Sequence, residues 1–217
     1  MTAGSGPRLF PGEPAAGPWR AGSLTEILGA VAPVSRRARV VAVDGRSGAG
    51  KTTLARRLAA TVPRSAIVHT DDIAWFHARF DWVALMRDGV LEPVQRGEAV
   101  AYRPPPWDER SRPGAVEVPA GCELLVVEGV GAGRSELADL LDVAIWVQSD
   151  RVVAREHGIA RDGGDVAGWD EWQSEELPFL ERDRPWERAD VIVAGTGLGV
   201  GGDSGVLVAP ALGERRQ

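Results

Sequence analysis

Short apolar runs, each ending in polar residues, recur along the chain. They occupy residues 39–44, 65–71, 123–129, 142–148 and 189–195 and consist largely of valine, isoleucine, leucine and alanine. Such nearly continuous runs are typical of strands buried on both faces, as in a parallel sheet. Helical spacing is found between the runs, where Leu54, Leu58 and Val62 are each four residues apart. Strands that alternate with helices predict an α/β domain.

The two ends of the chain differ in composition from the part that carries these runs. Residues 1–22 are rich in glycine, proline and alanine, and we expect them to form a flexible arm whose removal leaves the fold intact. Order is predicted to begin at Ser23, because Ser23 and Glu26 have the spacing of a capping box ahead of an apolar helix. The folded domain is expected to span residues 23–197, followed by a glycine-rich tail at 198–217 with one weak strand candidate, GVLVAP.

Charge and composition narrow the range of partners. The 217-residue chain has 44% hydrophobic residues and a formal net charge of −6, which disfavours a nucleic-acid polymer or an anionic membrane as the main partner. No apolar run approaches the roughly 18 residues that a membrane-spanning helix needs, and the proline-rich start does not resemble a signal peptide. The single cysteine fits a reducing compartment, so a cytoplasmic protein is expected. Homo-oligomerisation is left open.

The stretch VDGRSGAGKTT, residues 43–53, matches the phosphate-binding pattern G-x-x-x-x-G-K-[ST]. Glycines let the backbone wrap closely around an anion, and the helix that follows adds the positive end of its dipole. A chance match in a glycine-rich loop is the alternative, but a predicted strand precedes the motif and a predicted helix follows it. Nucleotide binding is therefore predicted for Gly45, Ser47, Gly48, Ala49, Gly50, Lys51, Thr52 and Thr53.

Lys51 is the only lysine in a chain that uses arginine for its other cations. Lysine supplies a slim, mobile point charge that can follow the β- and γ-phosphates, whereas the planar fork of arginine is bulkier. The sequence contains no asparagine, so it lacks the guanine-reading motif of GTPases and the catalytic-loop asparagine of protein kinases. A small-molecule kinase, an ATPase switch and a nucleotide-dependent regulator remain.

Acidic residues follow two other predicted strands: Asp71 and Asp72 in HTDD, and Glu128 in VVEG. In open α/β sheets, ligands bind beyond the carboxyl ends of the strands, so these groups are expected to face the terminal phosphate and its metal. A carboxylate there can accept the proton of an attacking hydroxyl, or can hold Mg²⁺ together with the hydroxyl of Thr52. Solvated strand ends and a helix cap are the alternatives, and a cap suits Asp72.

Together, DGRSGAGKTT, HTDD, VVEGV, IARDGG and RADVIVAG resemble the uridine kinase-like branch of P-loop kinases, in order over residues 39–195. The resemblance implies a three-layer P-loop NTPase fold with a central parallel sheet of about five strands. It also implies a helical substrate insertion at residues 73–122 and a short lid at about 150–172. ATP and Mg²⁺ would be the cofactors, with Asp71 as the catalytic base and Arg161, in IARD, as a lid arginine that contacts phosphate.

The insertion and the lid supply further candidates. Acceptor binding is predicted for Asp72, Asp81, Trp82, Tyr102 and Trp107. Aromatic faces can stack on a flat ligand, and ordinary core packing is the alternative for each tryptophan. In the lid, Arg155 is a candidate for closing over the phosphates beside Arg161, with a solvated basic face as the alternative. His69 and His77 have no metal-ligand spacing and are interpreted as structural.

Two departures from the family pattern concern the choice of acceptor. The family often has D-x-F-Y after the second strand, whereas this chain reads DDIA at residues 71–74, and the lid lacks the R-D-x-x-x-R-G continuation. The resemblance predicts transfer of the γ-phosphoryl of ATP to a hydroxyl of a small molecule, with the 5′-hydroxyl of uridine or cytidine as the first choice. A sugar, a vitamin precursor or an antibiotic as acceptor, and a non-catalytic ATP-binding switch, remain as alternatives.

Overall fold

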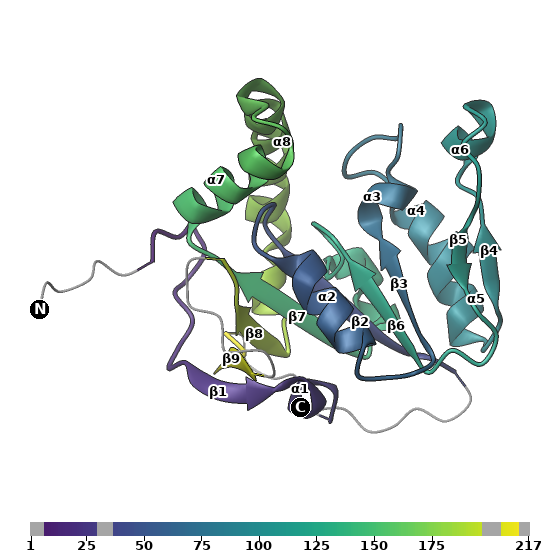
Figure 1. Cartoon of the computed structure of the whole chain (residues 1–217), viewed down its shortest axis with the longest axis horizontal. Coiled ribbons are helices and arrows are strands. Elements are labelled where there is room, and N and C mark those ends of the chain that lie inside the picture. Colours follow the sequence, from purple (N-terminus) through teal and green to yellow (C-terminus); the bar gives the residue numbers. More distant parts are fainter. Residues whose placement is uncertain (1–6, 30–36, 197–204, 213–217) are drawn as a thin grey trace, which may run out of the picture.

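A mostly parallel sheet forms the centre of the computed structural model, which describes residues 7–29, 37–196 and 205–212 (Figure 1). Its strands are β1 (Arg20–Ser23), β2 (Arg39–Gly45), β3 (Ser65–His69), β6 (Leu124–Glu128), β7 (Val143–Gln148), β8 (Val191–Ala194) and β9 (Gly205–Pro210). Their spatial order is β1-β9-β8-β7-β2-β6-β3, and the five strands from β8 to β3 pair in parallel. These five are the predicted apolar runs, so the predicted α/β fold and its central strands are confirmed.

Helices cover both faces of the sheet. They are α1 (Leu24–Gly29), α2 (Lys51–Ala59), α3 (Thr70–Ile73), α4 (Val83–Met86), α5 (Glu92–Gln95), α6 (Pro105–Glu109), α7 (Arg151–Arg161) and α8 (Val166–Asp183). Alternate residues of β2 pack in different clusters: Val41 and Val43 join the apolar side chains of α2, whereas Val40 and Ala42 join those of α4 and α5. Because both faces of β2 are buried, the strand needs the unbroken apolar run found in the sequence.

Two segments outside the predicted central sheet add edge strands to it: β9 is the strand candidate GVLVAP, whereas β1 lies at the end of the expected flexible arm, contrary to expectation. β1 pairs antiparallel with β9, and β9 pairs antiparallel with β8. The expected flexible arm is therefore wrong for residues 7–22, whose Glu13 is buried and whose Ala16 N–H donates to Gln148. The composition of this segment predicted flexibility, but its residues are buried by, and hydrogen-bonded to, distant parts of the chain. Residues 1–6, 197–204 and 213–217 lie outside the described residues.

The predicted insertion contains a hairpin as well as helices. Besides α4, a π-helical turn (Arg87–Leu91), α5 and α6, it holds the antiparallel strands β4 (Val100–Tyr102) and β5 (Val116–Val118). Two 3-10 turns, Ser135–Leu140 and Pro185–Glu187, complete the elements.

The predicted lid is the helix pair α7 and α8, which rises above the sheet in Figure 1. Gly163 and Gly164 join the two helices with φ of +73° and +88°, a conformation that favours glycine. α8 continues beyond the expected boundary to Asp183, because Phe179 and Leu180 are buried against Trp146 and Trp186. Within the described ranges, none of the helices combines the length and the apolar character of a membrane crossing.

Candidate functional site

The loop between β2 and α2, residues 45–50, is shaped by glycines that no larger residue could replace. Gly50 caps α2 with φ of +96°, and a Cβ on Gly48 would lie 2.0 Å from the carbonyl oxygen of Ala154 in α7. A Cβ on Gly45 would lie 2.7 Å from the carbonyl oxygen of Val147 in β7. Because these glycines have no side chain, the backbone of the loop can lie directly against the sheet and the lid. We call residues 45–52 the P-loop.

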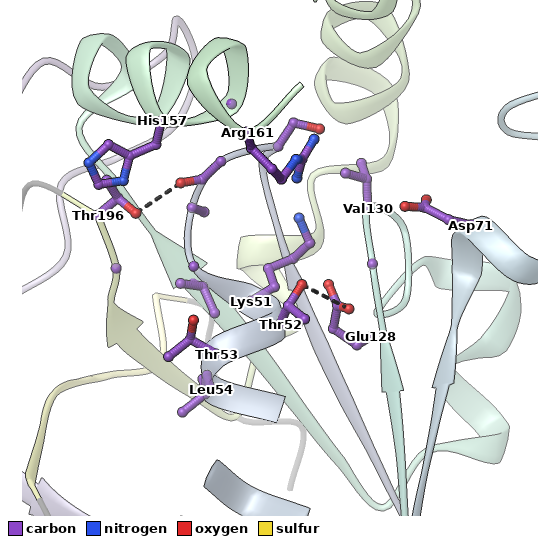
Figure 2. A pocket seen from close by; sticks show the side chains of 18 of the residues that line it. Lys51, Thr52, Thr53, Leu54, Asp71, Glu128, Val130, His157, Arg161 and Thr196 are labelled. Carbon is purple, nitrogen blue, oxygen red and sulfur yellow. Dashed lines mark hydrogen bonds between the residues drawn. The ribbon is translucent and has the colours of Figure 1, made fainter. Parts of the chain in front are cut away.

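A cavity of about 840 Å³ opens above the P-loop and the start of α2. The predicted nucleotide-binding residues from Ser47 to Thr53 all line it, whereas Gly45 does not. Lys51 is only 8% exposed and donates from Nζ to the carbonyl oxygen of Arg46 at 3.0 Å. Figure 2 shows Lys51 rising from α2 into the cavity, beneath Arg161. The volume suits a ligand of nucleotide size, and the N-terminus of α2 favours an anion.

Glu128, at the end of β6, reaches the hydroxyl of Thr52 (Figure 2). The Thr52 hydroxyl donates to Glu128 Oε2 at 3.2 Å, and His69 Nδ1 contacts the same oxygen at 2.7 Å. Burial acts to raise the pKa of Glu128, but the hydrogen bond from His69 and the charge of Lys51 outweigh it and hold this pKa below its ordinary value. The structural role predicted for His69 thus has a specific place, because its ring contacts the carboxylate of a predicted metal ligand.

The residue types at this corner fit Mg²⁺. The ion prefers oxygen ligands and usually keeps only one or two protein groups, the rest of its octahedron being water and phosphate. A hydroxyl and an ionised carboxylate 3.2 Å apart meet that requirement at Thr52 and Glu128. In the described part of the chain, no group of three or more His, Cys, Asp or Glu residues could hold a metal ion. Water and phosphate would therefore supply the other ligands of Mg²⁺ at this corner.

Asp71 and Asp72 diverge because β3 ends at His69 and the chain turns at once into α3. Asp71 lines the large cavity, and burial raises the pKa of its carboxyl while the charge of Lys51 partly opposes the rise. Asp72 points elsewhere and forms an ion pair with Arg112 at 2.5 Å. The first helical turn, rather than strand alternation, separates these neighbours.

A second, smaller cavity of about 180 Å³ adjoins the first. It is lined by Thr70, Asp71, Ala74, Arg79, Trp82, Val130 and Trp172. Asp71, Val130 and Trp172 line both cavities, so the Asp71 carboxyl lies in the wall where the two spaces meet. The guanidinium of Arg79 is held by Glu171 and Glu175 of α8, at 2.6 Å each, and supplies no unpaired charge to this space.

Of the predicted lid arginines, one faces the cavity. Arg161 lines it and pairs with Asp162, whose hydrogen bond raises the pKa of the guanidinium. Arg155 pairs with Asp170 on the exposed side of the helices and does not line the cavity. The prediction that Arg155 contacts phosphate thus finds no support in this arrangement, because its position on α7 directs it away from the P-loop.

Three of the predicted acceptor-binding aromatics serve mainly as packing. Trp82 is 1% exposed and donates to the carbonyl oxygen of Arg79; it contributes only a wall to the smaller cavity. Trp107 is 4% exposed and donates to the carbonyl oxygen of Asp72, while Tyr102, on strand β4 of the hairpin, lies over Gly89. Neither Trp107 nor Tyr102 lines a cavity that contains Asp71. Stacking of an acceptor on these side chains stays a prediction, in which Trp82 can take part as a wall of the smaller cavity, whereas Trp107 and Tyr102 lie away from Asp71.

Asp81, the remaining predicted acceptor ligand, is exposed and lines neither cavity. Sequence reasoning also missed residues that do line the large cavity, among them His157 and Trp169 of the lid and Thr196, whose hydroxyl donates to the carbonyl oxygen of Gly48. The lid residues could have been suspected from their position. Thr196 carries no motif, and its backbone N–H donation to Ala49 becomes visible only in the fold.

Asp44, immediately before the P-loop, is a buried carboxylate that organises the loop after β6. It accepts the backbone N–H groups of Gly45, Gly131 and Gly133 at 2.7–2.9 Å. Burial raises its pKa to about 6, although these three hydrogen bonds oppose the rise. Asp44 thereby joins the start of the P-loop to the segment that carries Val130, a residue common to both cavities.

We expect the stability difference between the wild type and Asp44→Asn to depend on pH. The folded pKa of about 6 lies above the ordinary 3.8, so the folded wild type binds the extra proton, and its stability falls as pH rises through this window. Asparagine cannot titrate, so the wild type should lose up to ~3 kcal/mol relative to the variant between pH 4 and pH 7. Denaturant unfolding at several pH values measures this, and a difference that does not change with pH would contradict it.

Comparisons with known proteins agree with this arrangement. The chain is similar to the structure of a "Possible Uridine Kinase" from Bacillus stearothermophilus, with a TM-score of 0.52 and 21% identity over 78% of this chain and 94% of that one. It is also similar to a "putative fructose transport system kinase" from Silicibacter sp. TM1040, with a TM-score of 0.54 and 19% identity over 74% and 90%. A scan of family models and a search of curated proteins found no match. The likeness shows a P-loop kinase fold and confirms the resemblance at that level.

Proposed function

We propose that the protein is an ATP-dependent phosphotransferase that transfers the γ-phosphoryl group to a hydroxyl of a small molecule. The observation that carries this proposal is the position of Asp71 in the wall common to the two cavities. A nucleotide held by the P-loop would fill the larger space, and a hydroxyl donor in the smaller space would meet the carboxyl at their junction. A switch protein without an acceptor has no need of that second space.

Each polar group around the junction has a role in such a transfer. Lys51 and the P-loop N–H groups bind the β- and γ-phosphates, and Arg161 supplies positive charge from the lid. Asp71 accepts the proton of the acceptor hydroxyl as the oxygen attacks phosphorus. Thr52 and Glu128 would hold Mg²⁺, which when bound neutralises phosphate charge. His69 donates to Glu128 and so fixes the direction of its carboxylate.

The acceptor proposed first is a pyrimidine nucleoside, phosphorylated at its 5′-hydroxyl. Support comes from the ordered motifs of the sequence and from the Bacillus structure described as a possible uridine kinase. A sugar is the second candidate, because the smaller cavity of about 180 Å³ has indole walls from Trp82 and Trp172 and its arginine is already paired. A compact neutral polyol suits such a space. The Silicibacter neighbour, described as a "putative fructose transport system kinase", also favours a sugar.

An acceptor screen tests the proposal. ADP release from MgATP is measured with uridine, cytidine, purine nucleosides, and a set of hexoses, pentoses and polyols, and with no addition. We expect turnover to rise above the acceptor-free rate with one chemical class, and a phosphorylated acceptor to be found by mass spectrometry. Lys51→Met serves as the inactive control for contaminating kinases. Tight MgATP binding with no acceptor-stimulated turnover would instead favour the switch.

A further inference from the structure

The side of the P-loop that faces away from the nucleotide cavity is held by buried acids. Arg46 forms an ion pair with Glu13, its Nε lying 3.1 Å from Oε2, and the two side chains are 2% and 1% exposed. The ring of Phe10 lies 3.6 Å from the centre of the guanidinium. Both Glu13 and Phe10 belong to the N-terminal segment that composition alone marked as a flexible arm, so this segment contacts the P-loop directly.

Glu13 is itself fixed by the central sheet. Its Oε1 accepts hydrogen bonds from Trp146 Nε1 at 2.8 Å and Gln148 Nε2 at 3.1 Å, both on β7. Three donors thus converge on one buried carboxylate. An uncompensated charge at this depth would cost several kcal/mol, so the position of Arg46 is closely tied to that of Glu13.

Arg46 in turn contacts Lys51, the only lysine of the chain. The carbonyl oxygen of Arg46 accepts the hydrogen bond from Lys51 Nζ at 3.0 Å. The next residue, Ser47, donates its N–H to Glu176 of α8 at 2.8 Å. Two acids, one from the N-terminal segment and one from the lid, therefore fix the backbone on which the Lys51 ammonium rests.

The same segment also reaches the lid. Arg8 donates its backbone N–H and its guanidinium to Asp150, the N-cap of α7, and its carbonyl oxygen accepts the N–H of Arg151. Residues 8–13 thus bridge the start of α7 and the outer side of the P-loop. Both of these elements contribute to the nucleotide cavity.

Stability alone does not account for an ion pair at this place. Replacing a buried pair by well-packed apolar residues is often neutral or stabilising, and one use of such pairs is to specify a single conformation.

We propose that Glu13 is a positioning residue for the nucleotide site. It anchors Arg46, and through the Arg46 carbonyl oxygen it sets the place of the Lys51 ammonium before the nucleotide arrives. The N-terminal segment is then an integral part of the phosphate-binding machinery. This inference rests on the proposed nucleotide binding but requires neither an acceptor nor turnover.

The first test compares Glu13→Gln with the wild type in MgATP binding and in the reactivity of Lys51. Because Lys51 is the only lysine, an acylating reagent followed by peptide mass spectrometry reports on this one side chain. We expect Kd for MgATP to rise about tenfold, a change within the range of coupling free energies measured for residues that act through a neighbour. We also expect Lys51 to be acylated several-fold faster. Asp142→Asn is the matched control, since it makes the same kind of change in another ion pair with little exposure, that of Asp142 with Arg37, at the opposite end of β2.

A merely structural role gives a different result. Glu13→Gln would then lower the melting temperature as Asp142→Asn does, while Kd for MgATP and the acylation rate stay at wild-type values, which would overturn the proposal. Should Glu13→Gln fail to fold, the double variant Glu13→Leu/Arg46→Met removes both charges. We expect it to recover the melting temperature but to keep the weaker MgATP binding; recovery of both would also overturn the proposal. Absence of kinase activity in the wild type refutes the proposed function and leaves these two readouts intact.

Discussion

Replacing Asp71 with asparagine is expected to lower kcat by about 10²–10⁴-fold, the usual contribution of a general base. Asparagine keeps the size and the hydrogen-bonding shape of the side chain but cannot accept the proton of the acceptor hydroxyl. The carboxyl lies in the wall between the two cavities, where no other carboxylate lines both spaces among the described residues. Binding of MgATP should change little, because the P-loop, Thr52 and Glu128 are untouched.

Asp72→Asn is the matched control for this substitution, because it makes the same chemical change one residue away. The Asp72 carboxylate pairs with Arg112, whose guanidinium lies 3.7 Å from the ring centre of Trp107. Loss of that partly exposed pair should cost at most about 1 kcal/mol of stability and leave kcat within a few-fold of the wild type. Steady-state kinetics with the best acceptor, together with nucleotide titration of each variant, separates the two residues.

The opposite pattern would show that the assignment is wrong. An inactive Asp72→Asn beside an active Asp71→Asn would mean that α3 turns the other carboxylate to the acceptor. If both variants stay active, the proton acceptor lies elsewhere. In that case Asp81→Asn is the next variant to measure.

The nucleotide site was the most predictable part of the molecule, because local rules determine it. The spacing of Gly45, Gly50 and Lys51 dictates a tight loop between a strand and a helix, and the structure has that loop. The apolar runs predicted the five parallel strands because a strand covered on both faces needs apolar residues at every position. These signals lie within a few residues of the features they describe, so no long-range information was needed.

The N-terminal segment was predicted wrongly because its order comes from distant partners. Its proline and glycine content indicated a chain that could not bury enough surface by itself. In the structure, β1 pairs with β9 almost two hundred residues later, and Glu13 is enclosed by Arg46, Trp146 and Gln148. Nothing in the local sequence around Glu13 reports these contacts.

The acceptor-binding residues were difficult to predict from the sequence for a related reason. Trp82, Tyr102 and Trp107 are aromatic residues in the correct segment, but composition cannot separate a stacking platform from a core side chain. The insertion packs on one face of the sheet, and Trp82 and Trp107 belong to the apolar cluster that joins Met86 and Val90 to β2 and β6. Ala74, Arg79 and Trp82 of the insertion do border the smaller cavity, but its other indole wall, Trp172, comes from the lid, far along the chain.

Replacement of Lys51 with arginine is expected to reduce kcat about 10²–10³-fold even though the charge is kept. The ammonium occupies a buried position, 3.0 Å from the carbonyl oxygen of Arg46, above a loop whose Gly45 and Gly48 already contact backbone. A guanidinium is broader and directs its N–H groups in a fixed plane, so it cannot follow the phosphates from this place.

Two variants separate charge from shape at this position: Lys51→Met removes the charge with little change in length, and Lys51→Arg keeps the charge. Arg56→Lys, at an exposed position on the same helix that does not line the cavity, is a control for exchanging the two cations. We expect Lys51→Met and Lys51→Arg to be similarly impaired in turnover, with melting temperatures close to that of the wild type, and Arg56→Lys to retain activity. Measurements of kcat, KM for ATP and thermal unfolding suffice. Near-normal turnover by Lys51→Arg would show that any cation serves here, and that the shape argument for the only lysine is wrong.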